Sequence, residues 1–203
     1  MSDTLAVNHS LGLRRLILLG LLFMLGAHLL AMLFSGSSAM STPISQLSRG
    51  NDGTVHTVGL VVLALLQPAL ALLLWRVGES SRLWLLACVL MTLNSLLLLY
   101  IAYYFASAPL STLVGPDAND PLALLASNVG VIMGCLIPGL KRRAPRCASY
   151  NLVLFVLWLG LVPVIPFIDA SWLGAYERVV GATLLSWFAV LALFLPSQKR
   201  ITR

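Results

Sequence analysis

The sequence contains very little charge. Only 10% of its 203 residues are Asp, Glu, Lys or Arg, whereas soluble domains carry about 25%. Hydrophobic residues make up 59% of the chain, and the mean hydropathy is +0.94. So few polar side chains cannot cover the surface of a water-soluble domain of this length. The composition excludes a soluble enzyme, a disordered chain and a disulfide-stabilised secreted domain, and it leaves an integral membrane protein.

The sequence also lacks the common motifs of metal binding and catalysis. Its three cysteines, Cys88, Cys135 and Cys147, have neither C-x-x-C nor Cys/His spacing, so they predict no metal site and no redox pair. The motifs H-E-x-x-H and G-x-S-x-G and the phosphate-binding P-loop are absent. We therefore expect no cofactor and no metal, and the sequence leans against an enzyme without deciding the question.

What the sequence does contain is six long apolar runs. Each is close to the ~20 residues that a helix needs to cross the hydrocarbon core of a bilayer. None has the alternating pattern of a barrel strand, and a helix satisfies its own backbone hydrogen bonds in lipid. We predict an all-α polytopic bundle of six transmembrane helices, forming one membrane domain over residues 1–203. The runs are residues 16–34, 56–75, 83–105, 122–140, 152–168 and 179–195.

The charged residues predict an orientation. If the N-terminus is cytoplasmic, eleven of the thirteen basic residues lie inside, and only Arg49 and Arg178 lie outside. An excess of Lys and Arg on the cytoplasmic side is the usual rule for membrane proteins. The pattern predicts that both termini are cytoplasmic and that the protein lies in the inner membrane of a bacterium. No aromatic-interleaved basic face is present, so we expect no nucleic-acid partner.

Polar residues near the outer ends of the runs are the candidates for a ligand site, because polar groups at membrane depth are costly. We expect Glu177 and Arg178 to open the sixth helix, where the helix dipole favours a carboxylate. Near mid-depth, the amide of Gln67 is expected to bond the backbone carbonyl that Pro68 leaves free, and Asn94 is expected to form a hydrogen bond between helices; a structural role is expected for both. The candidate ligand-binding residues are His28, Ser45, Arg49, His56, Asn128, Glu177 and Arg178.

Three further patterns predict local structure. Pro163 and Pro166 should kink or end the fifth helix, because proline removes helix hydrogen bonds. The segment Pro43–Leu47 is predicted to form one amphipathic turn on the membrane surface. Small residues at every fourth position of the fourth run favour close packing against another helix of the same chain over a dimer interface. These residues are Ala126, Gly130, Gly134 and Pro138.

Several short motifs resemble a family of bacterial and archaeal membrane proteins called domain of unknown function 998. The segment Pro43–Gly50 is similar to the Ile-Ser-x-Leu-Gly motif before the family's second helix. Gly59-Leu60 lies within an apolar helix, and Gly174–Arg178 is similar to the family's Gly-x-x-(Gln/Glu)-Arg motif. The resemblance covers most of the chain and implies six helices, but it implies no activity.

The sequence leaves three functions open. The first is a bundle that binds or moves an apolar or lipid-like molecule through an outward-facing cavity lined by His28, Asn128, Glu177 and Arg178. The second is an accessory or scaffold subunit that packs on another membrane protein. The third is a membrane enzyme acting on a lipid-linked substrate, which requires Ser45, His56 and an acid on the outer side within hydrogen-bond reach. The expected partners are therefore the lipid bilayer, an apolar small molecule or lipid, or a membrane protein.

Overall fold

Six α-helices make up most of the protein. The computed structural model describes residues 2–36, 38–48, 53–77, 79–107 and 120–196, and no strand occurs among them. Each α-helix, α5 together with η4, supplies a stretch long and apolar enough to cross a membrane, which confirms the predicted all-α fold. In chain order the elements are α1 Ser2–Ser35, η1 Ile44–Ser48, α2 Gly53–Arg76, α3 Arg82–Ser107, α4 Asp120–Arg143, α5 Pro145–Leu161, η4 Val162–Phe167 and α6 Ala170–Phe194.

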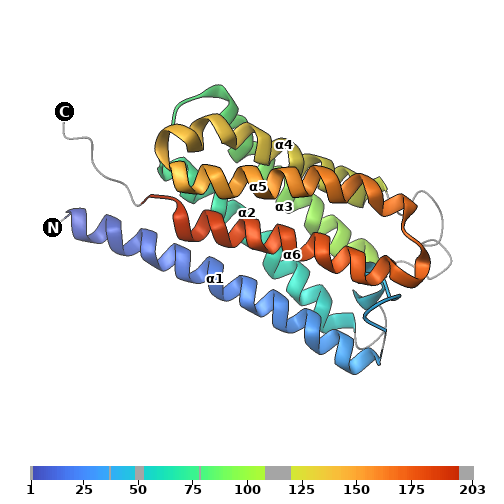
Figure 1. The fold of residues 1–203 in the computed structure, drawn as a ribbon. Helices are drawn as coiled ribbons and strands as arrows, with labels where there is room; N and C mark the ends of the chain where they lie inside the picture. Colours follow the sequence, from blue (N-terminus) through green and yellow to red (C-terminus); the bar gives the residue numbers. More distant parts are fainter. Residues whose placement is uncertain (1, 37, 49–52, 78, 108–119, 197–203) are drawn as a thin grey trace.

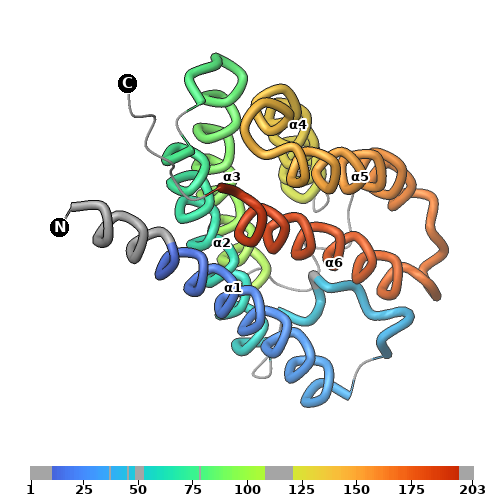
Figure 2. The backbone as a smooth tube through the Cα atoms, turned by 60° about the vertical axis from the view of Figure 1, so that its left-hand side comes forward, coloured from blue at the N-terminus to red at the C-terminus, as the bar shows by residue number. Residues whose placement is uncertain are grey.

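The helices pack in sequence order, and the last closes on the first. Each α-helix contacts its neighbours in the chain, and α6 also contacts α1 (Figures 1 and 2). At one end, Arg14 of α1 donates hydrogen bonds to the carbonyl oxygens of Leu193, at 3.4 Å, and Leu195. We call this the basic end, because the basic residues from Arg76 to Arg82 and from Lys141 to Arg146 lie there. The opposite end, where α1 ends and α2 and α6 begin, is the loop end.

Local sequence sets where several helices begin and end. Gly36 follows α1 with φ = 59°, a left-handed conformation that glycine adopts easily and that commonly ends helices. Pro145 lies in the first turn of α5, where its missing N–H costs no helix hydrogen bond. The side chain of Asp169 caps α6 by accepting a hydrogen bond from the backbone N–H of Ser171 at 2.8 Å. Helix α5 ends at Leu161, and Pro163 and Pro166, which were predicted to kink or end it, lie in the 3-10 helix η4 that follows.

Two predictions of local structure are wrong. Helix α6 begins at Ala170, not at residue 179, so Arg178 lies about 12 Å inside the helix at ~1.5 Å per residue. Glu177 is therefore too deep to be stabilised by the N-terminal dipole, which acts within the first turn. The apolar pattern did not reveal this start, because polar side chains interrupt the pattern. Contacts within the protein satisfy these side chains, so the helix continues through them. The predicted surface turn is instead the helix η1, and it packs into the bundle with Leu47 and Ser48 buried.

Candidate functional site

Two histidines from different helices meet near the loop end. The rings of His28 in α1 and His56 in α2 have centroids 5.4 Å apart and planes inclined by 59°. Gly59, one turn after His56, permits this approach. A Cβ atom there would lie 2.8 Å from the sulfur of Met24 and 2.9 Å from Cβ of Ala27, so any side chain would push α1 and α2 apart.

A serine from η1 contacts the second histidine. The Oγ atom of Ser48 lies 2.7 Å from Nδ1 of His56, which is hydrogen-bond distance. Both residues are buried, since Ser48 is 3% exposed and His56 is fully enclosed. The helix η1 thus positions a hydroxyl group on one nitrogen of the ring and leaves the other nitrogen facing the interior.

Arg178 of α6 connects the loop to the bundle. Its Nη1 atom donates hydrogen bonds to the carbonyl oxygens of Ala39 at 2.9 Å, Thr42 at 3.0 Å and Gly174 at 2.6 Å. Its Nε atom lies 3.4 Å from the sulfur of Met32, one turn after His28 in α1. A single guanidinium therefore joins α6, the loop before η1 and α1.

The segment Gly174–Arg178 is also the surface on which this loop rests. The Oε2 atom of Glu177 accepts a hydrogen bond from the backbone N–H of Ile44 at 2.6 Å. A Cβ atom at Gly174 would lie 2.9 Å from the carbonyl oxygen of Met40 and would collide with that of Thr42. Only glycine leaves room for the loop here, so Gly174 is required for the close approach.

Three buried nitrogen atoms in this region have no hydrogen-bond partner among the described residues. They are Nε2 of His28, Nε2 of His56 and Nη2 of Arg178. A buried donor or acceptor left without a partner costs about 1–3 kcal/mol, and Arg178 interacts electrostatically with both rings. We call His28, Ser48, His56, Glu177 and Arg178 the polar cluster. Buried groups of this kind need a partner that the described residues do not supply, such as a water molecule, an ion or a ligand.

A comparison with known protein families finds a match over most of the chain. Residues 17–194 match the family model described as Protein of unknown function (DUF998). The chain belongs to this family. No curated protein and no solved structure matches it. The two motifs that resemble the family most closely, around η1 and at Gly174–Arg178, lie more than 120 residues apart in this DUF998 chain, and the structure places them in contact.

The predicted site residue Asn128 belongs to a different set of contacts. Its Nδ2 atom donates to Oδ1 of Asn94 at 2.9 Å and to the carbonyl oxygen of Leu90 at 3.3 Å. Asn94 in turn donates to Oε1 of Gln67 at 2.9 Å. We call Gln67, Asn94 and Asn128 the amide network. It links α2, α3 and α4 and confirms the hydrogen bond between helices predicted for Asn94. The side-chain hydrogen bond that the structure gives Gln67 runs to Asn94, and not to the carbonyl that Pro68 leaves free.

Two of the predicted site residues, Ser45 and Arg49, lie in or next to η1. The backbone of Ser45 lies in η1, but its side chain is outside the described residues, and so is all of Arg49. Ser45 and Arg49 were predicted as site residues, whereas Ser48, which contacts His56, was not. The only available signal was its place in the family-like segment, because a 3-10 helix of five residues has too few turns to give a hydrophobic period.

Asn151 of this DUF998 protein was also missed, because it precedes the predicted fifth run by one residue. It is fully buried, accepts a hydrogen bond from the indole nitrogen of Trp187 at 2.8 Å and donates to the carbonyl oxygen of Met133 at 3.0 Å. These contacts join α5 to α6 and α4. They satisfy both polar atoms of the amide and indicate a structural role.

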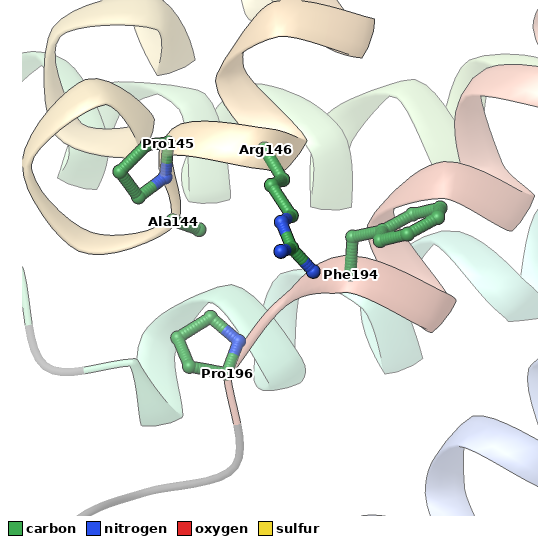
Figure 3. Close-up of a pocket in the computed structure, with 5 residues that line it drawn as sticks. All are labelled: Ala144, Pro145, Arg146, Phe194 and Pro196. Carbon is green, nitrogen blue, oxygen red and sulfur yellow. The ribbon is translucent and has the colours of Figure 1, made fainter.

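Two grooves among the described residues lie away from the polar cluster. A groove of about 500 Å³ runs between α4 and α5, where Gly130 and Gly134 face Trp158 and Phe155. The small residues thus pack against α5 of the same chain. Neither groove is lined by the residues predicted for the outward-facing cavity. A second groove, of about 360 Å³, lies at the basic end (Figure 3). It is lined by Ala144, Pro145, Arg146, Phe194 and Pro196.

The described residues offer little for a metal ion. No group of three or more His, Cys, Asp or Glu side chains among them is arranged to hold one. The two histidines of the polar cluster have Arg178 beside them, and a cationic neighbour opposes binding of a metal cation.

Proposed function

We propose that this DUF998 protein binds a lipid-like amphiphile, with the polar head in the polar cluster and the apolar tail against α1 and α6. The observation that carries the proposal is the set of three buried nitrogen atoms without partners, on His28, His56 and Arg178. They lie about 5–12 Å from the ends of their helices at ~1.5 Å per residue. This depth corresponds to the outer part of the hydrocarbon core, below the polar head groups.

The seam between α1 and α6 supports a place for the tail. These two helices run side by side (Figures 1 and 2), and their contact is less extensive than that between any two α-helices consecutive in the chain. Arg178 crosses this seam to reach Met32. Beside it, Leu29, Leu33 and Val179 are more than half exposed and present an apolar surface. A tail lying here would remain in the hydrocarbon phase while its head reaches the polar cluster.

The proposal also includes an orientation: both termini cytoplasmic, in the inner membrane of a bacterium. The gathering of basic residues at the basic end supports it. Ser41 and Ser80 are both exposed, at the loop end and the basic end respectively. We expect Ser41→Cys to react with a membrane-impermeant thiol reagent in intact cells, and Ser80→Cys to react only after the cells are opened. The reverse pattern would contradict this orientation.

A second candidate function is catalysis, and one observation favours it. The hydroxyl of Ser48 and Nδ1 of His56, 2.7 Å apart, have the geometry of a nucleophile and its base. Against this, Nε2 of His56, the ring nitrogen away from the serine, has no partner among the described residues, whereas in a catalytic triad an acidic side chain orients that nitrogen. Ser48→Ala separates the two functions, because it would abolish hydrolysis of a lipid ester but reduce binding of an amphiphile only modestly.

Binding can be tested by identifying the molecules that stay bound to the protein through purification. The protein, purified in a mild detergent, should carry an amphiphile that is visible by native mass spectrometry. His28→Phe keeps the ring but removes the unpaired nitrogen, so we expect loss of most of the retained molecule. Leu96→Phe introduces the same ring at an exposed position of α3, away from α1 and α6, and should retain it. A wild-type protein that carries no amphiphile and takes up none from lipid vesicles would overturn the proposal.

A further inference from the structure

We infer that the head group bound by the polar cluster carries a phosphate, whose oxygens accept hydrogen bonds from Nη2 of Arg178 and Nε2 of His56. This inference rests on the proposed function and specifies its ligand. It follows from the hydrogen-bonding capacity of each unpaired nitrogen, taken in turn.

The unpaired nitrogen of Arg178 requires an acceptor. A guanidinium has five N–H donors and no acceptor, and it stays charged in proteins. Nη1 and Nε of this residue are already engaged with the loop, α6 and the sulfur of Met32. Nη2 is buried and has no partner among the described residues. Only an electron-rich atom can satisfy it, and an anionic oxygen does so most strongly.

The contact with Ser48 makes His56 a second donor. Among the described residues, the only partner of the Ser48 hydroxyl is Nδ1 of His56. If Nδ1 donated to the hydroxyl, the hydroxyl hydrogen and the Nε2 lone pair would both lack partners. If the hydroxyl donates to Nδ1, only the Nε2–H group lacks one. The second arrangement leaves fewer unpaired buried groups, so His56 presents an N–H donor to the interior.

His28 completes the set from a third helix. Its Nε2 is buried and unpaired, and its ring lies beside that of His56. A neutral imidazole can carry its hydrogen on either nitrogen, so His28 can present a third donor to an anion. The nearby carboxylate, Glu177, does not occupy the site with its Oε2 atom, because that oxygen accepts from the backbone of Ile44.

The arrangement favours phosphate over carboxylate. The three nitrogens approach from α1, α2 and α6, and a tetrahedral phosphate offers oxygens in several directions, whereas a carboxylate is planar with two. The depth agrees. At ~1.5 Å per residue the 24-residue helix α2 is about 36 Å long, slightly longer than the ~30 Å hydrocarbon core. His56, in its first turn, therefore lies near the edge of the hydrocarbon core, next to the head-group layer.

The test compares head groups on the full-length protein. Phosphatidylglycerol, diacylglycerol, oleic acid and inorganic phosphate are offered in turn, and binding is followed by native mass spectrometry and by ³¹P NMR of the bound phosphorus. We expect phosphatidylglycerol to bind roughly tenfold or more tightly than diacylglycerol, because each charge-assisted hydrogen bond contributes substantially. His56→Phe and Arg178→Met should each remove most of this preference. If Arg178→Met does not fold, His28→Phe provides the same comparison without disturbing the loop.

The outcomes separate this inference from the proposal beneath it. Equal binding of diacylglycerol and phosphatidylglycerol, or tighter binding of oleic acid, would overturn the phosphate and leave amphiphile binding intact. Binding of inorganic phosphate that no lipid displaces would support the phosphate but overturn the lipid. If none of the four probes binds, both fail. A preference for phosphatidylglycerol that survives His56→Phe, Arg178→Met and His28→Phe would place the phosphate elsewhere and overturn the inference.

Discussion

The amide network and the polar cluster are two ways of placing polar side chains in a membrane bundle. Gln67, Asn94 and Asn128 lie near mid-depth and pair with one another across α2, α3 and α4. None of their atoms is among the buried atoms of the described residues that lack a partner. The polar cluster lies nearer the loop end, yet nitrogens of His28, His56 and Arg178 remain unpaired.

The difference teaches that polarity at membrane depth does not identify a site by itself. The amide network is a closed set of hydrogen bonds, because none of its atoms is among the unpaired buried atoms of the described residues. It therefore leaves no unpaired buried donor or acceptor for a ligand. The polar cluster is an open set: its unpaired nitrogens are removed from water without the hydrogen bonds that would offset the free-energy cost of burial. The amide network is therefore expected to serve stability, and the polar cluster to serve binding, and the following variants test that division.

The largest effect is expected where the loop meets α6. Gly174→Ala would place a methyl group against the carbonyl oxygens of Met40 and Thr42. We expect about 1–3 kcal/mol of destabilisation, from overpacking, together with loss of the bound amphiphile. Gly160→Ala is the matched control, because nothing lies within 4 Å of a Cβ atom there. The buried thiols of Cys88 and Cys147 allow thermal unfolding to be followed with a thiol-reactive dye. Equal stability of the two variants would contradict the docking of the loop.

The next effect sharpens the comparison from the stability side. Asn151→Leu removes the acceptor of the Trp187 indole and the donor to Met133. Because a stranded buried group costs about 1–3 kcal/mol, the variant should unfold at lower temperature while retaining its ligand. Loss of the ligand at full stability would show that the division between structural and binding groups is wrong.

A smaller effect compares the two regions directly. Asn94→Leu strands the amides of Gln67 and Asn128, and such interhelical bonds contribute about 0.6 kcal/mol on average in membranes. His28→Phe removes an atom without a partner, so in ligand-free protein it should cost less than Asn94→Leu. Unfolding of both variants after delipidation measures this order. A larger loss from His28→Phe would mean that its nitrogen is satisfied within the protein.

Charge at the basic end should matter less still. Glu79 accepts hydrogen bonds from Arg142 and Arg143, each at 3.0 Å, and both arginines are substantially exposed. Pairs of this kind contribute about 0–1 kcal/mol and weaken with salt. Glu79→Gln should therefore lower stability slightly in low salt and negligibly in high salt. A salt-independent loss would indicate another role for Glu79.

The smallest effect is a pH dependence at the start of α6. Hydrogen bonds from the hydroxyl and the backbone N–H of Ser171 hold the pKa of Asp169 below its ordinary value of 3.8. Because the folded pKa is the lower one, this stabilisation is complete above about pH 4 and is lost as the pH falls through the folded pKa. Unfolding of the wild type and of Asp169→Asn should converge at low pH. A difference that grows on acidification would contradict this cap.

Much of the fold could be predicted, and the limits are instructive. The six apolar runs gave the six helices because membrane insertion depends mainly on composition over about 20 residues. The start of α6 was misplaced because Tyr176, Glu177 and Arg178 interrupt the apolar pattern, although the helix continues through them. Of the candidate site, His28, His56, Glu177 and Arg178 were named from the sequence, whereas Ser48 was not. Asn128 was named too, but it joins the amide network.

The sequence by itself determined that the chain is a helical membrane protein and which few polar residues lie at depth. Both depend on composition along a segment, which is a local property. Only the tertiary structure decided which polar groups pair and which stay open, because His28, His56 and Arg178 come from three separate helices, α1, α2 and α6. Their meeting depends on the rotation of each helix about its axis and on close approach at Gly59 and Gly174. These are properties of packing, and no single segment contains them.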